Sequence, residues 1–272
     1  MGRYNQKNIH IDPSVYQHPA DRTASDAVRK SEAFQKALGL ISRFGIEKEI
    51  HGLYRACYAQ ITPSVSPAIH EMLKEAQEMF DVPVIPDIFL ERTYQMRVLL
   101  TGVERPVVTV SSELLRQMDE PMLWGLMASE MAAVKAGFGE IKLIEWLCST
   151  AGPLLPAGIA ASLKVLLKNW HRYAQYTYDR TTLIAGGDFN RAVRFMLLGE
   201  APAGVLDKMD FLDPNNRYMK QCRSFLSEKD LVANTVRGAG AVLSGGDFYA
   251  SRYMELFRFY HSDYQDLIEE FE

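Results

Sequence analysis

This sequence has few cysteines and a small net charge. The three cysteines among 272 residues, Cys57, Cys148 and Cys222, are odd in number and widely spaced. This pattern excludes a disulfide framework and is typical of reduced core thiols in a cytosol. The formal charge of −4 provides no basic field of the kind that draws proteins to nucleic acid or anionic lipid. We therefore expect a cytoplasmic protein that does not bind nucleic acid.

Long apolar runs are almost absent as well. The opening stretch MGRYNQKNIHIDPS contains no apolar segment, so no secretory signal is expected. Residues 143–167 are the exception, with Glu145 and Lys164 as their only charges. Gly152-Pro153 and Pro156 divide this run into two pieces, each too short to span a bilayer. We expect a pair of buried helices there and no membrane contact.

Common catalytic signatures are missing too. The sequence has no GxSxG, no P-loop and no CxxC. The glycine-rich pieces at 186–187 and 238–246 fall at expected helix ends and lack a phosphate-binding pattern. These absences remove the usual motif-based arguments for a serine hydrolase, a nucleotide-binding enzyme or a dithiol oxidoreductase.

The most informative stretch that is present is 118–138, MDEPMLWGLMASEMAAVKAGF. Asp119 suits an N-cap, Pro121 suits a first turn, and Gly137 is a natural stop. The stretch therefore predicts one complete helix. Its apolar residues recur at helical spacing and predict a buried face: Leu123, Leu126, Met127 and Val134.

The middle of this helix has part of a zinc-peptidase pattern. In an HExxH peptidase, two histidines four residues apart bind zinc, and the glutamate beside the first activates water. Glu130 fills the glutamate position here, whereas Ser129 and Ala133 stand at the two histidine positions. No two of the six histidines in the chain are four residues apart.

The flanking segments strengthen this partial pattern. Residues 81–101 followed by RPVVTVSSELLRQMDE at 105–120 resemble the strands and short helix that precede the active-site helix in the HtpX and CAAX-prenyl-protease family. QYTYDR at 175–180 is similar to that family's ExxAD segment, and the match continues through 184–194. Near the C-terminus, 245–256 resembles its HPF…R…EL segment, with Gly246 at the histidine position and Arg252 at the arginine.

The resemblance covers most of the chain from His18-Pro19 onward and is closest to the soluble minigluzincin type. It implies that the third zinc ligand would be replaced by Gln175. Zinc needs imidazoles and a carboxylate at these three positions. The chain supplies a neutral hydroxyl at Ser129, no donor atom at Ala133 and a neutral amide at Gln175. We therefore expect no zinc and no other cofactor.

The resemblance also implies roles for residues around the site. Glu130 would be a vestigial general base, with Asp179 and Arg252 as supporting scaffold residues. Val107, Val108, Thr109 and Val110 would form the sheet edge beside the cleft, where free backbone groups can pair with an extended peptide. His171 lies one turn before Gln175 and is either an ordinary hydrogen-bonded histidine beside Trp170 or a relocated metal ligand.

Three functions are compatible with these residues. The leading hypothesis is a pseudopeptidase that binds a peptide or protein partner as a scaffold. An active metallopeptidase with an unconventional site is the first alternative. The second is a non-peptidase enzyme that reuses Glu130, although a lone carboxylate contributes only about 10²–10⁴-fold as a general base.

The periodicity predicts an α+β fold that is mostly helical, with a small sheet beside the central helix, and the resemblance implies that this fold is gluzincin-like. We expect one two-lobed domain over 1–272, divided near residue 137 into 1–137 and 138–272. Strands are predicted at 84–90, 94–101 and 106–111. Residues 1–23 are expected to be irregular, and 54–62 is a strand or a helix end. Helices are predicted at 25–44, 67–80, 163–184, 189–198, 215–226 and 248–260, with a short one in 202–214 and another from Ser227 toward Gly245.

The tail, 262–272, combines five acidic residues with no basic one. Acids at a helix C-terminus oppose the macrodipole, so this helix needs a support. Tyr264, Leu267, Ile268 and Phe271 supply an apolar stripe for that support. The stripe predicts docking on the chain's own cleft, on a second copy, or on an active relative; simple closure of the core is the alternative.

Overall fold

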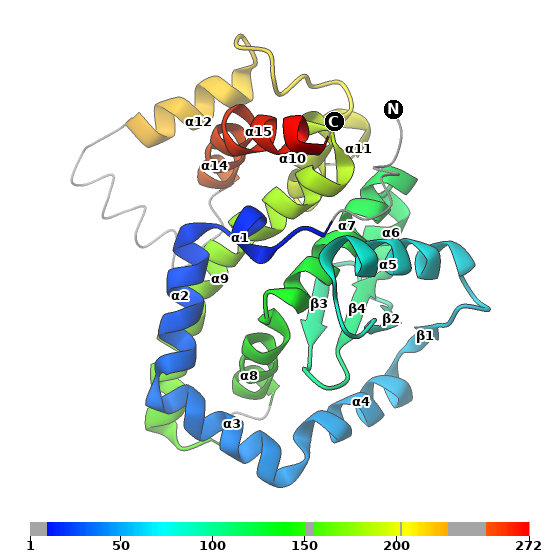
Figure 1. The fold of residues 1–272 in the computed structure, drawn as a ribbon, viewed down its shortest axis with the longest axis vertical. Helices are drawn as coiled ribbons and strands as arrows, with labels where there is room; N and C mark the ends of the chain where they lie inside the picture. Colours follow the sequence, from blue (N-terminus) through cyan, green and yellow to red (C-terminus); the bar gives the residue numbers. More distant parts are fainter. Residues whose placement is uncertain (1–9, 151–154, 202, 228–248, 272) are drawn as a thin grey trace.

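The computed structural model describes residues 10–150, 155–201, 203–227 and 249–271 (Figure 1). It is mostly helical and contains one small mixed sheet, which confirms the predicted α+β class. The opening helices are α1 (Pro13–Tyr16), α2 (Pro19–Lys30), α3 (Glu32–Phe44) and α4 (Ile46–Cys57). Figure 1 shows α2 beside the long helix α9 (Ala157–Gly186), and the two are packed together.

Two expectations for the N-terminal part are wrong. Residues 1–23 were expected to be irregular, but α1 and the first turn of α2 lie within them because Asp12 and His18 cap these helices. The single helix expected over 25–44 is broken at Ser31, whose backbone is extended at φ −72° and ψ 139°. The Ser31 hydroxyl caps α3 by accepting from Phe34 N, a role for which serine is well suited.

The sheet has the strand order β1-β2-β4-β3. Its strands are β1 (Ala59–Ile61), β2 (Asp87–Glu91), β3 (Val98–Thr101) and β4 (Val107–Ser111). β2 and β4 are parallel, and the other two pairings are antiparallel. The ambiguous segment 54–62 contains both predicted alternatives, the end of α4 and then β1.

The predicted sheet edge at Val107–Val110 is wrong. β4 pairs with β2 on one side and β3 on the other, so its backbone groups belong to two ladders. All five residues of β4 are buried, which is typical of a central strand covered on both faces. The terminal strands are β1 and β3.

The central helix is α7 (Glu120–Lys135), which follows α5 (Pro67–Phe80) and α6 (Ser112–Gln117) and precedes α8 (Phe138–Thr150). The Asp119 carboxylate accepts from Met122 N at 2.8 Å, and Gly137 adopts φ 75° in the turn to α8. Both ends of the predicted helix are therefore confirmed. α7 packs against α5, α8, α9 and α10 (Phe189–Leu197).

The second half is helical, as predicted. The helix expected over 163–184 is present within the longer α9, and Asp188 caps α10 by accepting from Arg191 N. The helix expected from Ser227 and the segment 245–248 lie outside the described residues, apart from Ser227 itself at the end of α12. The remaining helices are α11 (Ala203–Leu206), α12 (Arg217–Ser227), α14 (Tyr249–His261) and α15 (Asp263–Phe271).

The apolar run 143–167 is divided between α8 and the start of α9. Leu163 and Leu167 are buried, but Val165 is 72 % exposed, so the expectation of two fully buried helices holds for only part of the run. Across the described ranges, no helix combines the length and hydropathy required to cross a membrane.

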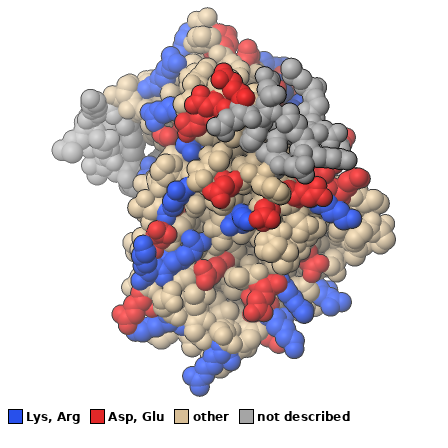
Figure 2. Space-filling view, in the orientation of Figure 1, with Lys and Arg blue, Asp and Glu red and all other residues tan. Residues whose placement is uncertain are grey.

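The tail packs on its own chain. Tyr264 and Leu267 of α15 are buried in the core, and the Tyr264 ring stacks on Tyr260 of α14 with 5.7 Å between centroids. For these two residues the structure agrees with the alternative prediction, in which the stripe simply closes the core. The acidic residues Asp263 and Asp266 remain exposed, and on the face drawn in Figure 2 acidic and basic side chains are interspersed.

Candidate functional site

Helices α7 and α9 pack against each other, as predicted for the two segments that carry the candidate residues. They approach closely at Gly125, where an added Cβ would lie 3.3 Å from the Thr182 side chain. Further along the same contact, Glu130 of α7 interacts with Tyr178 of α9. Gln175 is one helical turn before Tyr178 and is half-buried.

The two residues at the predicted histidine positions are enclosed in the core. Ser129 is 1 % exposed and donates its hydroxyl hydrogen to Leu126 O at 2.9 Å. Ala133 is also 1 % exposed and has no donor atom. The side-chain amide of Gln175 lies 3.4 Å from His171 Nε2.

This donor set does not fit a zinc ion. Zinc requires three ligands with available lone pairs, normally imidazole or carboxylate, and the three positions supply one hydroxyl bonded to the backbone and one amide. In the described part of the chain, no group of three His, Cys, Asp or Glu side chains is arranged to hold a metal. These positions therefore give no support for a zinc-dependent reaction step.

Glu130 is the most unusual group of the site. It is 4 % exposed, and its Oε2 has no hydrogen-bond partner in the described structure. Burial raises the pKa of Glu130 to about 7, while the charge of Lys142 and the hydroxyl of Tyr178 act in the opposite direction. The carboxyl therefore changes charge near neutral pH inside the core.

A polar group from α8 and α9 lies beside Glu130. Lys142 Nζ is 3.1 Å from Glu145 Oε2 and 3.3 Å from His171 Nδ1. Because His171 also contacts Gln175, its prediction as a hydrogen-bonded histidine beside Trp170 is confirmed. Lys142, Glu145 and Tyr178 were missed as site residues; their only sequence signal was a charge pair at i, i+3 and a tyrosine inside the QYTYDR segment.

The two predicted supporting residues form a direct ion pair. Arg252 of α14 donates through Nε and Nη2 to the two carboxylate oxygens of Asp179 at 2.9 and 2.7 Å. The Asp179 side chain is 4 % exposed and that of Arg252 is 11 % exposed. This bidentate pair joins α14 to α9 and is shielded from solvent.

Replacing Asp179 with Ala is expected to lower the free energy of unfolding by about 3 kcal/mol, because it leaves the guanidinium of Arg252 buried without its carboxylate. Urea denaturation of Asp179→Ala, Arg252→Ala and the double variant measures this. The double variant is expected to lose less than the sum of the two single losses. Strictly additive losses would show that the pair does not act as a unit.

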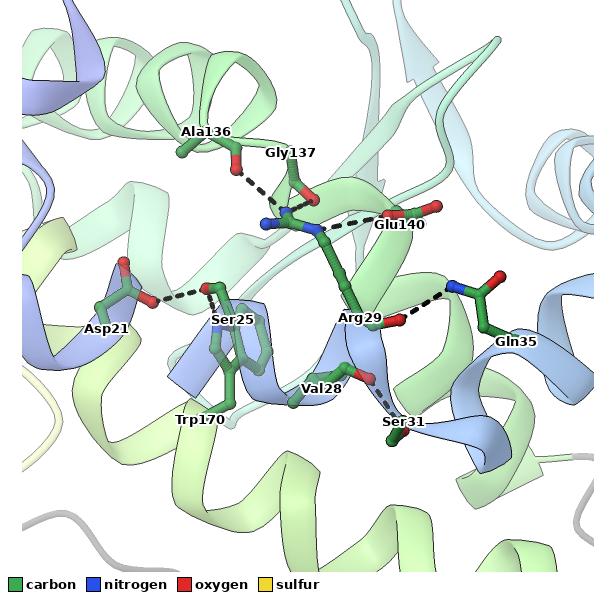
Figure 3. Close-up of polar contacts among 10 residues, drawn as sticks. All are labelled: Asp21, Ser25, Val28, Arg29, Ser31, Gln35, Ala136, Gly137, Glu140 and Trp170. Atoms are coloured by element: carbon green, nitrogen blue, oxygen red, sulfur yellow. Dashed lines mark hydrogen bonds and ion pairs between the residues drawn. The ribbon is translucent and has the colours of Figure 1, made fainter. Parts of the chain in front are cut away.

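A second polar network joins α2 to α9 (Figure 3). Asp21, which is fully buried, accepts from the hydroxyls of Thr177 at 2.7 Å and Ser25 at 3.1 Å. Ser25 Oγ in turn accepts from Trp170 Nε1 at 2.9 Å. This network positions the half of α9 that carries His171, Gln175 and Tyr178.

Helix α2 also holds the turn after α7. Arg29 Nη2 donates to the carbonyls of Ala136 and Gly137 at 3.1 and 2.9 Å, and Arg29 Nε lies 3.4 Å from Glu140 (Figure 3). A cation at carbonyls that end a helix complements the macrodipole. α2 therefore anchors both α9 and the α7–α8 turn.

Together these contacts define a helical α+β protein with a buried acidic site between α7, α8 and α9. Comparison with known protein families, with curated proteins and with solved structures finds no match for the chain. The relation to the HtpX and CAAX-prenyl-protease family therefore stays a prediction from the motifs.

Proposed function

We propose that this protein is a non-catalytic, metallopeptidase-like module that binds a peptide or protein partner. The observation that carries the proposal is the enclosure of Glu130, which is 4 % exposed. A general base has to reach the water molecule and the substrate that it acts on. A carboxyl sealed between packed helices is poorly placed for that role.

The chemistry of the neighbouring positions supports the same conclusion. Metal-assisted hydrolysis relies on a Lewis acid and a metal-bound hydroxide, and Ser129, Ala133 and Gln175 lack the ligands for such an ion. Glu130 alone would supply only the general-base part, about 10²–10⁴-fold. Hydrolysis of a peptide bond at a useful rate is therefore not expected.

The proposed binding edge is β3, because β4 is interior. Ser111 N donates to Arg97 O at 3.0 Å, and in an antiparallel ladder the alternate residue turns its N–H and C=O away from the partner strand. Val98 is therefore directed away from β4, and it is only half-buried. An extended peptide can add through main-chain hydrogen bonds at this end of β3, away from Gly102, whose N–H already donates to Gly139 O of α8.

Replacing Val98 with Pro tests this edge. Proline removes the outward N–H while leaving the bonds to β4 intact, so binding of a library of short unstructured peptides is expected to be lost with the fold retained. Leu99→Pro is the matched control, since it removes a bond to β4 and should destabilise the sheet. Equal peptide binding by the wild type and Val98→Pro would reject β3 as the binding edge.

Elemental analysis of protein purified without chelators, together with a peptide-cleavage assay, tests whether the protein is a non-catalytic module. We expect no stoichiometric zinc and no cleavage of peptide substrates. A zinc content near one per chain that disappears on replacing His171 or Glu130 would overturn the proposal in favour of an active metallopeptidase with an unconventional site.

Restoring the three ligand types tests the family assignment. The combined variant Ser129→His, Ala133→His and Gln175→Glu is expected to bind one zinc ion. Two imidazoles must fit into packed positions, so the metal-free variant should be destabilised by about 2–3 kcal/mol. Added zinc should then raise its thermal midpoint well above that of a matched variant that retains Gln175. Failure to bind zinc would count against the assignment.

A non-peptidase enzyme is the second candidate, and the pKa of about 7 at Glu130 is the observation that favours it. Groups whose pKa lies near the working pH are the most effective general acids and bases. Turnover of any substrate that is lost in Glu130→Gln without loss of stability would support this candidate over a binding module.

A further inference from the structure

Lys142 connects the buried carboxyl of Glu130 with charged groups nearer the surface. Its side chain is only 10 % exposed, and its Nζ lies 5.3 Å from the centroid of the Trp170 ring. There it is 3.1 Å from Glu145 Oε2 and 3.3 Å from His171 Nδ1. Among the described residues it is also the one cation whose charge acts on Glu130.

Glu130 and Lys142 are close enough to influence each other, but no ion pair joins them in this arrangement. Oε2 of Glu130 is buried without a partner, which is tolerable for a neutral carboxyl and costly for an ionised one. Lysine has a flexible stem and a compact ammonium head. Its head, which lies over the Trp170 ring, can therefore turn toward Glu130.

We propose that Lys142 exchanges partners, from Glu145 and His171 to Glu130, when Glu130 loses its proton, so that the contact between α8 and the α7–α9 pair depends on pH. This inference does not rest on the proposed function, because it concerns the packing of three helices and applies equally to a binding module or an enzyme.

The groups around Glu130 determine the direction and range of the change. From α9 it meets the hydroxyl of Tyr178 and from α8 the ammonium of Lys142; Glu145 and Asp21 act one step further out, on Tyr178. Burial raises the pKa of Glu130 to about 7. The folded protein therefore holds the proton at acidic pH and releases it as the pH rises through neutrality, which is when Lys142 is drawn inward.

The change would be transmitted through α8. This helix carries both Lys142 and Glu145, and it packs against β3. The carbonyl of Gly139, in its first turn, accepts from Gly102 N at 3.3 Å. A shift in how α8 is held should therefore be detectable at its own amides and at Gly102.

Hydrogen exchange of the full chain, corrected for intrinsic exchange and measured across a pH series, tests the proposal. We expect protection of the α8 and Gly102 amides to change with a midpoint near the pKa of about 7, and Glu130→Gln to abolish that change. Lys142→Met keeps an unbranched apolar side chain but removes the charge that lowers the pKa of Glu130. Because it also removes the group that changes partners, it should abolish the pH-dependent change in α8, as Glu130→Gln does.

His171→Gln is the matched control, because histidine side chains generally change charge between pH 5 and 8. This variant should keep the midpoint of the wild type. The proposal is overturned if protection in the wild type does not depend on pH. It is also overturned if the dependence survives Glu130→Gln but disappears in His171→Gln.

Discussion

Replacing Asp21 with Ala is expected to lower the free energy of unfolding by about 4 kcal/mol, the largest effect that we expect from a single substitution. Asp21 is fully buried and accepts from the side chains of Thr177, Ser25 and Gln17 at 2.7 to 3.1 Å. Removing the acceptor leaves these donors without their partner, and each such buried group costs about 1–3 kcal/mol. Urea denaturation measures the loss.

The control is Asp26→Ala on the same helix. Its carboxylate is more than half exposed and lies 3.5 Å from Lys30 in an i, i+4 pair, an arrangement that contributes about 0.5 kcal/mol or less. A loss for Asp21→Ala as small as that for Asp26→Ala would show that the network does not hold α2 to α9.

The effect of Asp21 should also vary with pH. Burial raises the pKa of this carboxyl, although its hydrogen bonds from Thr177, Gln17 and Ser25 act in the opposite direction. The folded state therefore binds the proton more tightly than the unfolded state does. The stability contributed by Asp21 is greatest below its ordinary pKa and falls as the pH rises through the raised value. The difference between wild type and Asp21→Ala should shrink accordingly.

The central helix could be predicted closely because its signals are local. Asp119 caps the first turn and Gly137 takes the positive φ that ends the helix. Each signal involves groups within a few residues of one another and depends little on the rest of the fold. The helix start at Ser31 carried a comparable local signal, a serine followed by an acidic residue, that the sequence interpretation did not use.

Strand order could not be predicted in the same way. The segment Val107–Val110 was correctly predicted as a strand but wrongly as an edge, since its neighbours β2 and β3 are chosen by long-range packing. One local hint was available. The run is nearly continuous in apolar character instead of alternating, and this pattern is more typical of a strand covered on both faces.

The candidate site was partly accessible from the sequence. Glu130, Gln175, His171 and the pairing of Arg252 with an acid followed from motif spacing on three helices. Lys142 did not, because its approach to Glu130 depends on how the Gly137 turn directs α8 against α9. The same limit applies to Asp21, whose importance comes from its contacts with a helix more than 140 residues away along the chain.

Gly139→Ala is also expected to have a large effect, a loss of about 3 kcal/mol. A Cβ at this position would lie 2.1 Å from the carbonyl oxygen of Gly102, closer than any real contact. Gly102 cannot easily retreat, because it adopts φ 100° and the next residues are held by Glu47, whose carboxylate accepts from Val103 N at 2.6 Å and Arg105 N at 3.1 Å. Either α8 or the end of β3 must shift, and overpacking of this kind costs about 1–3 kcal/mol.

Gly52→Ala separates this steric cost from the general effect of adding a methyl group. Gly52 lies inside α4, and a Cβ there meets nothing within 4 Å. Alanine should therefore stabilise the protein by about 0.5–1 kcal/mol through its better helix propensity. The midpoints of thermal and urea unfolding should both rise for Gly52→Ala and both fall for Gly139→Ala. If Gly139→Ala proves neutral or stabilising, the contact between α8 and β3 must be looser than the hydrogen bond from Gly102 N to Gly139 O indicates, and α8 could not transmit a change at Lys142 to the sheet.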